Sequence, residues 1–209
     1  MMKSVSYKLI EFFIAFVIVP ASFALNFDWK IKVGIGLVGF IYIVFVLLRI
    51  EKKAFKINPN LNWKQFWKTT LFKFIGIAVL TFLYVLFFDR SNLFSVVVNK
   101  PKLWIIILFI YTFLSVYPQE LIYRTFFFER YQKLFSSSNL FIFINAIVFS
   151  LGHIFFKNTL VIILTFIGGL LFALTYNQSK STLLVSIEHV IYGCWLFTVG
   201  MGDMLGFPS

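Results

Sequence analysis

The sequence of 209 residues is poor in charge, in acidic residues and in cysteine. Charged residues make up 13% of the chain, and only 8 residues are Asp or Glu. A soluble domain has about 25% charged and about 45–50% apolar residues, whereas 60% of this chain is hydrophobic. The composition therefore excludes an ordinary soluble domain and indicates an integral membrane protein. The only cysteine, Cys194, excludes an internal disulfide and a four-cysteine zinc site.

The sequence also lacks the motifs of several hydrolase classes. It has no HExxH motif, which places two histidines and a glutamate around zinc on one helix, and no GxSxG nucleophile motif. No Ser/Lys or Asp/Asp pattern of a membrane protease is evident. No segment alternates as a membrane barrel strand does, and no repeat or low-complexity tract is present.

Long apolar runs predict the fold. A spanning helix needs about 20 mostly apolar residues, and about seven windows qualify. We therefore predict an all-α fold, a polytopic transmembrane bundle of about seven helices. The windows are Leu9–Leu25, Val33–Leu48, Leu71–Phe88, Leu103–Tyr117, Leu140–Phe156, Leu160–Tyr176 and Leu183–Val199.

Two of these windows need comment. The first follows basic residues as a signal peptide does, but it is long and has no clear cleavage site, so we expect a retained helix. The fourth is expected to continue as one helix to about Leu134, with a kink or a helix start at Pro118. We expect residues 1–209 to form a single membrane domain, in which 1–102 are anchoring helices and 103–199 are the functional core.

Basic residues predict orientation and partners. The formal net charge is +11, and Lys and Arg collect in cytoplasmic loops, where they face anionic headgroups. We therefore expect the basic residues to contact membrane lipids, and we expect no nucleic acid as a partner. A cytoplasmic N-terminus is predicted by the basic loop before the third window and by Arg130 and Lys133 after the fourth. We expect the membrane to be a bacterial inner membrane. Trp63 and Trp67 in the loop Arg49–Lys68 predict an interfacial anchor helix.

Six polar side chains lie within the apolar windows or directly beside them. Charge inside a bilayer costs about 2.5–3.5 kcal/mol per residue on insertion scales, so residues kept there are commonly functional. Both histidines of the chain are among them. The six are Lys73, Glu120, Arg124, His153, Glu188 and His189. Lys73 lies near the start of its window, and we expect its amine to reach the headgroups.

Glu120 and Arg124 are four residues apart and share a helix face. Two interpretations remain open for them: an internal ion pair that stabilises a buried carboxylate, or a general base tuned by its partner. His153 and His189 are the single histidines of two otherwise apolar helices, where a packing role is more common than a functional one. If these side chains converge, they hold a water directly or through a divalent metal such as zinc, with His153, His189 and Glu120 as ligands.

The order of these residues forms three motifs. They are Gln119-Glu120-x-x-x-Arg124, then Phe149-x-x-x-His153, then His189 in a late helix. This order resembles the CPBP intramembrane proteases, which include the CAAX prenyl endopeptidases and the bacteriocin-processing or immunity proteins of the Abi family. The family pattern is EExxxR, FxxxH and HxxxN or HxxxD on separate transmembrane helices. The resemblance covers about Pro118 to Val199.

The resemblance implies an intramembrane endopeptidase whose helical bundle encloses a polar intramembrane cavity. A glutamate activates water to hydrolyse a peptide bond of a membrane-associated or lipidated peptide, while the late His and Asn bind the oxyanion. Carried over by position, the catalytic residues are Glu120, Arg124, His153 and His189, and the cavity residues are Gln119, Phe149 and Gly193.

Two positions depart from the family pattern. Gln119 stands where the first glutamate belongs, and a glutamine cannot accept a proton from water. Gly193 stands where the Asn or Asp belongs and offers no side-chain donor. Either Glu120 has become the base, or the protein is an impaired or inactive relative that acts as an immunity or scaffold protein. A proton-coupled carrier also uses intramembrane Glu and His, but the chain shows no paired halves with broken helices.

Overall fold

The computed structural model describes residues 2–53 and 61–206. Within these ranges all regular structure is helical and no strand is present, which confirms the all-α prediction. The chain divides into two compact units, of which unit 1 is Met1–Ile57 with Gln119–Lys180 and unit 2 is Asn58–Pro118 with Ser181–Ser209. The division into anchoring helices and a functional core beginning near residue 103 stays a prediction.

In the part of the chain that the structure describes, seven helical stretches are long and apolar enough to cross a membrane. Each contains or overlaps one predicted window, so the predicted number of spans is confirmed. The stretches are Val5–Ser22, Trp29–Ile50, Trp63–Phe88, Pro101–Leu134, Ser138–Phe156, Thr159–Ser179 and Thr182–Val199.

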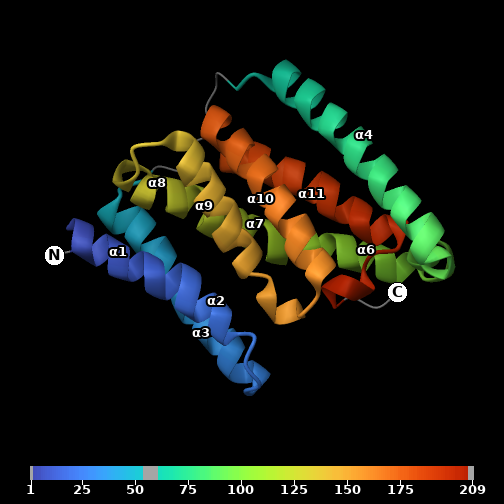
Figure 1. Cartoon of the computed structure of the whole chain (residues 1–209), viewed down its shortest axis with the longest axis horizontal. Helices are drawn as coiled ribbons and strands as arrows, with labels where there is room; N and C mark the ends of the chain where they lie inside the picture. The colour runs from blue at the N-terminus through green and yellow to red at the C-terminus, as the bar shows by residue number, and fades with distance from the viewer. Residues whose placement is uncertain (1, 54–60, 207–209) are drawn as a thin grey trace. The chain divides into compact units, whose positions relative to one another are not determined.

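Unit 1 is built from the first two spans, the second part of the fourth, and the fifth and sixth. Its elements are α1 (Val5–Phe13), η1 (Ile14–Ile18), α2 (Val19–Ser22), α3 (Trp29–Phe45), η2 (Val46–Ile50), η5 (Leu121–Phe126), α8 (Phe127–Tyr131), η6 (Gln132–Leu134), α9 (Ser138–Leu151), η7 (Ile154–Phe156) and α10 (Thr159–Ser179). The helices α9 and α10 lie side by side (Figure 1). A Cβ on Gly169 would lie 3.0 Å from the Ala146 Cα, so glycine is what allows this close approach.

The ends of the helices follow from local sequence. Asn158 caps α10 by accepting hydrogen bonds from the amides of Leu160 and Val161 at 2.9 and 3.2 Å, and Ser181 caps α11 (Thr182–Val199) through the amide of Leu184. Such caps satisfy amides that the first helical turn leaves without partners. These polar residues therefore separate consecutive apolar spans.

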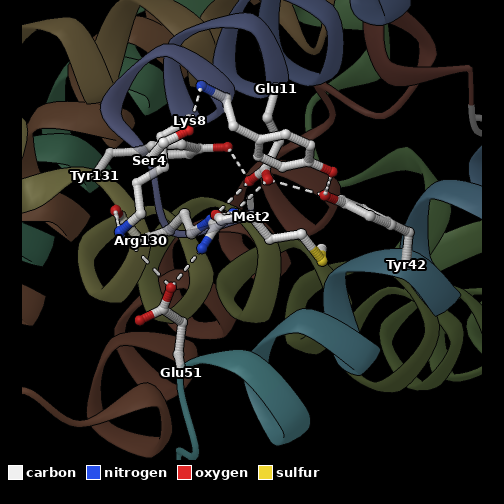
Figure 2. Close-up of polar contacts among 9 residues, drawn as sticks. Met2, Ser4, Lys8, Glu11, Tyr42, Glu51, Arg130 and Tyr131 are labelled. Atoms are coloured by element: carbon white, nitrogen blue, oxygen red, sulfur yellow. Dashed lines mark hydrogen bonds and ion pairs between the residues drawn. The ribbon is translucent and has the colours of Figure 1, made fainter.

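A buried polar cluster joins the N-terminal helices of unit 1 to α8 (Figure 2). Arg130 donates to both carboxylate oxygens of Glu11 at 2.9 and 2.7 Å and to Glu51 at 2.7 Å. Glu11 also accepts hydrogen bonds from the hydroxyls of Tyr131 and Tyr42 at 2.7 and 2.8 Å. A buried carboxylate is stable when its oxygens are satisfied in this way, so the cluster fixes α1, α3 and α8 together.

This cluster corrects one sequence-based assignment. Arg130 was counted as a loop charge, but its side chain is fully buried and ion-paired, so it does not contribute to the loop charge that sets orientation. Lys133 alone remains of the two basic residues assigned to that loop.

Unit 2 packs α11 against α4 (Trp63–Phe88), and the two helices lie side by side (Figure 1). The Trp195 indole donates to the Thr81 hydroxyl at 2.8 Å, and its ring meets Phe74 edge to face. The remaining elements are η3 (Arg90–Asn92), α5 (Ser95–Asn99), α6 (Pro101–Ile110), η4 (Tyr111–Val116) and η8 (Asp203–Leu205). Val96, Ile107 and Phe197 form a buried apolar cluster among them.

The predicted anchor helix is only partly within the described residues. Positions 54–60 lie outside them, whereas Trp63 and Trp67 belong to the first two turns of α4. Both indoles are about two-fifths exposed, at 40% and 41%. The tryptophans therefore begin a membrane span instead of a separate interfacial helix.

The fourth span runs through Pro118 without interruption, so the predicted continuation to Leu134 is confirmed and a helix start at Pro118 is excluded. Pro118 lies in α7 (Tyr117–Glu120), between the π-helical turns η4 and η5. Proline lacks an amide and crowds the preceding turn, and a wider turn relieves this conflict. Turns of this kind are frequent at functional sites.

Candidate functional site

Glu120 and Arg124 form an ion pair inside the fourth span. The Arg124 Nε lies 3.4 Å from Glu120 Oε2, and both side chains are fully buried. Glu120 ends α7 and Arg124 lies in η5. The pairing expected from their spacing is confirmed, and it compensates two charges that would each be costly alone in a bilayer.

Arg124 is held from three further directions. Its Nη1 donates to the Asn145 Oδ1 at 3.0 Å and to the Tyr123 carbonyl at 3.3 Å, and the Asn145 amide donates to the same carbonyl at 2.7 Å. The guanidinium carbon lies 4.6 Å from the centre of the Phe149 ring, within cation–π range. These contacts restrict the guanidinium to one position beside Glu120.

His153 lies just beyond the end of α9, whereas the sequence placed it within a helix. The helix ends at Leu151, and His153 occupies the turn before η7. The His153 Nδ1 lies 2.8 Å from the Phe149 carbonyl, which can only accept, so the neutral ring carries its proton on Nδ1. The Nε2 is then the nitrogen that accepts a proton, a hydrogen bond or a metal ion.

Gly152 is required beside this histidine. A Cβ at this position would lie 2.2 Å from the Tyr123 hydroxyl oxygen. The Tyr123 ring is packed edge to face against Phe149 and Phe16, at 5.2 and 5.6 Å, so the hydroxyl has little room to withdraw. The absence of a side chain at Gly152 therefore allows the Tyr123 hydroxyl to lie against the turn that carries His153.

Unit 1 thus connects four predicted residues through a chain of contacts. Glu120 touches Arg124, Arg124 touches Phe149, and the rings of Phe149 and His153 are 4.8 Å apart. Gln119 precedes Glu120 in α7 and is half-buried. This arrangement places a carboxylate, a guanidinium and an imidazole on one continuous set of side chains.

His189 belongs to unit 2 and is almost fully buried in α11, at 6% exposure. The ring of Tyr111 meets the imidazole edge to face at 6.0 Å. Gly193 follows one turn later on the same helix and is also buried. Cys194 is half-buried, with its sulfur 4.0 Å from the Thr112 hydroxyl.

Lys73 does not extend to the headgroups as expected. Its Nζ lies 2.9 Å from the Oε1 of Glu188, whose side chain is fully buried. The Tyr192 hydroxyl donates to the same oxygen at 2.8 Å. The prediction that Lys73 reaches the headgroups is wrong, because its amine pairs with a buried carboxylate of α11 and so joins α4 to α11.

A metal centre remains a prediction. Among the described residues, no three His, Cys, Asp or Glu side chains are grouped to hold a metal ion. The three candidate ligands, Glu120, His153 and His189, are divided between the two units. The donor chemistry of His153 suits a metal, because a ligating imidazole normally donates its other N–H to a carbonyl or carboxylate.

Unit 1 also contains an apolar groove of about 860 Å³ along α1, α2 and α3. Its lining includes three glycines of α3 and the polar ends of Tyr7, Glu11 and Tyr42. None of the predicted catalytic residues lines it. The predicted polar cavity is a different feature and stays a prediction.

Sequence reasoning did not identify several residues that hold the site. Asn145 is a single amide within an apolar run and belongs to none of the three motifs, yet it anchors Arg124. Tyr111 gave no signal, because a tyrosine in an apolar run is common at membrane interfaces. Glu11 and Lys73 lie in the half of the chain to which no chemistry was assigned, yet both form buried ion pairs.

Comparison with known proteins gives a match to a family model. No curated protein and no solved structure matches the chain. Residues 101–195 match the family model described as type II CAAX prenyl endopeptidase Rce1-like. This range contains the three motifs, from Gln119 to Gly193. Over residues 101–195 the chain is therefore similar to the Rce1-like endopeptidase family, in agreement with the resemblance to the CPBP proteases.

Proposed function

We propose that the protein is an intramembrane endopeptidase of the CAAX-protease type, which hydrolyses a peptide bond of a membrane-associated or lipidated peptide. The observation that carries the proposal is the fully buried pair of Glu120 and Arg124 in a segment that matches the endopeptidase family. A carboxylate at that depth is costly, and its guanidinium partner compensates the charge.

In the proposed reaction Glu120 is the general base. It takes a proton from a water molecule as the water oxygen attacks the peptide carbonyl carbon, and the carbonyl electron pair moves to the oxygen. The carbonyl then re-forms as the C–N bond breaks, and the leaving nitrogen takes the proton from Glu120, which gives a carboxylic acid and an amine and restores the Glu120 carboxylate. Arg124 orients Glu120, while His153 and His189 hydrogen-bond the water or the oxyanion. The assignment of His189 to this reaction rests on the family resemblance.

A divalent metal such as zinc is the alternative way to activate the water. Glu120, His153 and His189 would then be its ligands, and a bound metal lowers the pKa of its water. The hydrogen bond from His153 Nδ1 to a carbonyl supports this variant for one ligand.

A second candidate function is that of a catalytically impaired relative, an immunity or scaffold protein in the membrane. Gln119 and Gly193 favour it, because the family has a glutamate and an Asn or Asp there. In that case Glu120, Arg124 and Asn145 form a structural network only. Substitutions among them would then lower stability without any activity to lose.

The test is cleavage of a panel of prenylated and unmodified peptides by the purified protein in detergent. Wild type is compared with Glu120→Gln, with Gln119→Glu and with Glu129→Gln. The last is a matched control, because Glu129 is a carboxylate with a partly exposed side chain that pairs with Lys53. Cleavage that is lost only in Glu120→Gln supports the endopeptidase. Cleavage gained only in Gln119→Glu supports the impaired relative.

We also propose a bacterial inner membrane with a cytoplasmic N-terminus. The basic residues of the loop before α4 support this orientation. Membrane lipids and the peptide substrate are the proposed partners, and the charge of the loops is assigned to headgroups instead of nucleic acid.

A further inference from the structure

Gly193 has no side chain, and the hydroxyl of Tyr111 occupies the space that a side chain at this position would fill. A Cβ built on Gly193 would lie 2.0 Å from the Tyr111 hydroxyl oxygen and 2.4 Å from its Cζ and Cε1. Both residues belong to unit 2. An amide at position 193 would occupy the volume that the phenol now fills, so Tyr111 and any larger residue at 193 exclude one another.

Tyr111 is fixed in this position by one face of α11. His189, Gly193 and Phe197 follow one another at intervals of four residues and therefore share that face. The Tyr111 ring meets the His189 ring edge to face at 6.0 Å and the Phe197 ring at 4.8 Å. The phenol therefore lies across all three residues, with its hydroxyl at the middle one.

The backbone of η4 contributes to this placement. Tyr111 is the first residue of that π-helical turn, and such a turn changes the direction in which a side chain leaves the helix. The next residue, Thr112, lies against Cys194, the neighbour of Gly193. Two consecutive residues of η4 thus contact two consecutive residues of α11, which defines the register between them.

We propose that Tyr111 is the hydrogen-bond donor that replaces the absent Asn or Asp and stabilises the oxyanion beside His189. This inference rests on the proposed endopeptidase function. The hydroxyl donates a hydrogen bond and keeps its proton, so the steps of hydrolysis are unchanged. A phenol O–H suits this role, since tyrosine hydroxyls serve as oxyanion donors in other enzymes. The departure at Gly193 is then a relocation of the donor and not its loss.

The test measures turnover and the affinity for a peptide phosphonate, whose tetrahedral anion imitates the oxyanion. The proteins are the full chain in detergent as wild type, Tyr111→Phe, Tyr111→Ala, Gly193→Asn and Tyr111→Ala/Gly193→Asn. Tyr111→Phe removes only the hydroxyl, so kcat should fall about 10²–10³-fold with KM little changed. The phosphonate affinity should fall by a similar factor, and the thermal midpoint should stay close to that of wild type.

The paired substitutions separate donation from packing. Gly193→Asn alone places its Cβ against the phenol and should be inactive. The double variant Tyr111→Ala/Gly193→Asn has room for the amide, so its kcat should be at least tenfold higher than that of Tyr111→Ala. Wild-type kcat and phosphonate affinity in Tyr111→Phe would overturn the proposal, and so would the absence of recovery in a double variant that is folded.

The measurements of peptide turnover and of phosphonate affinity also distinguish a failure of this proposal from a failure of the endopeptidase function. If wild type cleaves no peptide, the proposed function fails, and phosphonate binding decides the role of Tyr111. Binding that weakens in Tyr111→Phe would still identify an anion site at this hydroxyl. Binding that is absent, or equal in both proteins, would overturn it.

Discussion

Removal of the Arg130 guanidinium tests whether the buried polar cluster holds the N-terminal helices of unit 1. Arg130→Met keeps a long apolar side chain but deletes four hydrogen bonds, two to Glu11, one to Glu51 and one to the Met2 carbonyl. The side chain of Glu11 is 5% exposed. The variant therefore leaves a buried carboxylate with only the hydroxyls of Tyr131 and Tyr42 as partners.

The expected cost follows from this geometry. Removal of one partner of a buried ion pair costs about 3–5 kcal/mol, because the remaining charge is not compensated. A loss of about 4 kcal/mol lowers the ratio of folded to unfolded protein by about 10³-fold. The double variant Arg130→Met/Glu11→Met should recover much of this loss, since replacement of both partners by apolar groups is often neutral.

Equilibrium unfolding in mixed micelles, followed by tryptophan fluorescence, measures these free energies. Lys53→Met is the matched control, because Lys53 pairs with Glu129 and both side chains are partly exposed, at 25% and 35%. A pair of this kind contributes about 0–1 kcal/mol. Equal free energies of unfolding for Arg130→Met and Lys53→Met would refute the reasoning. Failure of the double variant to recover would show that the carboxylate is not the source of the cost.

Three further results are expected. Lys73→Met should destabilise unit 2, because it leaves Glu188 without its cation, whereas Lys73→Arg should largely retain stability. Equal unfolding midpoints for the two variants would contradict this expectation. Gly152→Ala should cost about 1–3 kcal/mol through the clash with the Tyr123 hydroxyl, and Tyr123→Phe should relieve part of it; additive effects of the two changes would argue against the clash. Chelation should leave peptide cleavage unchanged if Glu120 acts directly on water. If chelation abolishes cleavage, elemental analysis of the purified protein shows whether a metal was bound.

The sequence was sufficient for the fold because its information is carried by long apolar runs. Each run of Leu, Ile, Val and Phe specifies a helix of membrane length, and the seven spans follow. The spacing of Glu120 and Arg124 also predicted their contact, since i and i+4 residues meet on any helix.

Contacts between distant segments were not predictable in the same way. Lys73 and Glu188 are 115 residues apart, and nothing in either local sequence specifies that they pair. The same holds for Arg130, which is indistinguishable in sequence from a loop cation until Glu11 is placed beside it. Apolar spans of similar composition pack in many arrangements, so their polar partners emerge only from the tertiary structure.

The prediction that His153 lies within a helix failed for a local reason. The apolar run continues past it to Phe156, and hydropathy does not mark where a helix ends. The end at Leu151 is set by Gly152 and by the turn that carries the imidazole, and this turn is what directs Nδ1 to the Phe149 carbonyl.

Whether Glu120 activates the attacking water is tested most directly by peptide cleavage in oxygen-18-labelled water, with product masses and rates compared for wild type and Glu120→Gln. The substitution keeps an oxygen near Arg124 but removes the base. We predict that wild type incorporates the label into the new carboxylate and that the folded variant is slower by about 10²–10⁴-fold, the usual contribution of a general base. Cleavage by folded Glu120→Gln at the wild-type rate would contradict the assignment.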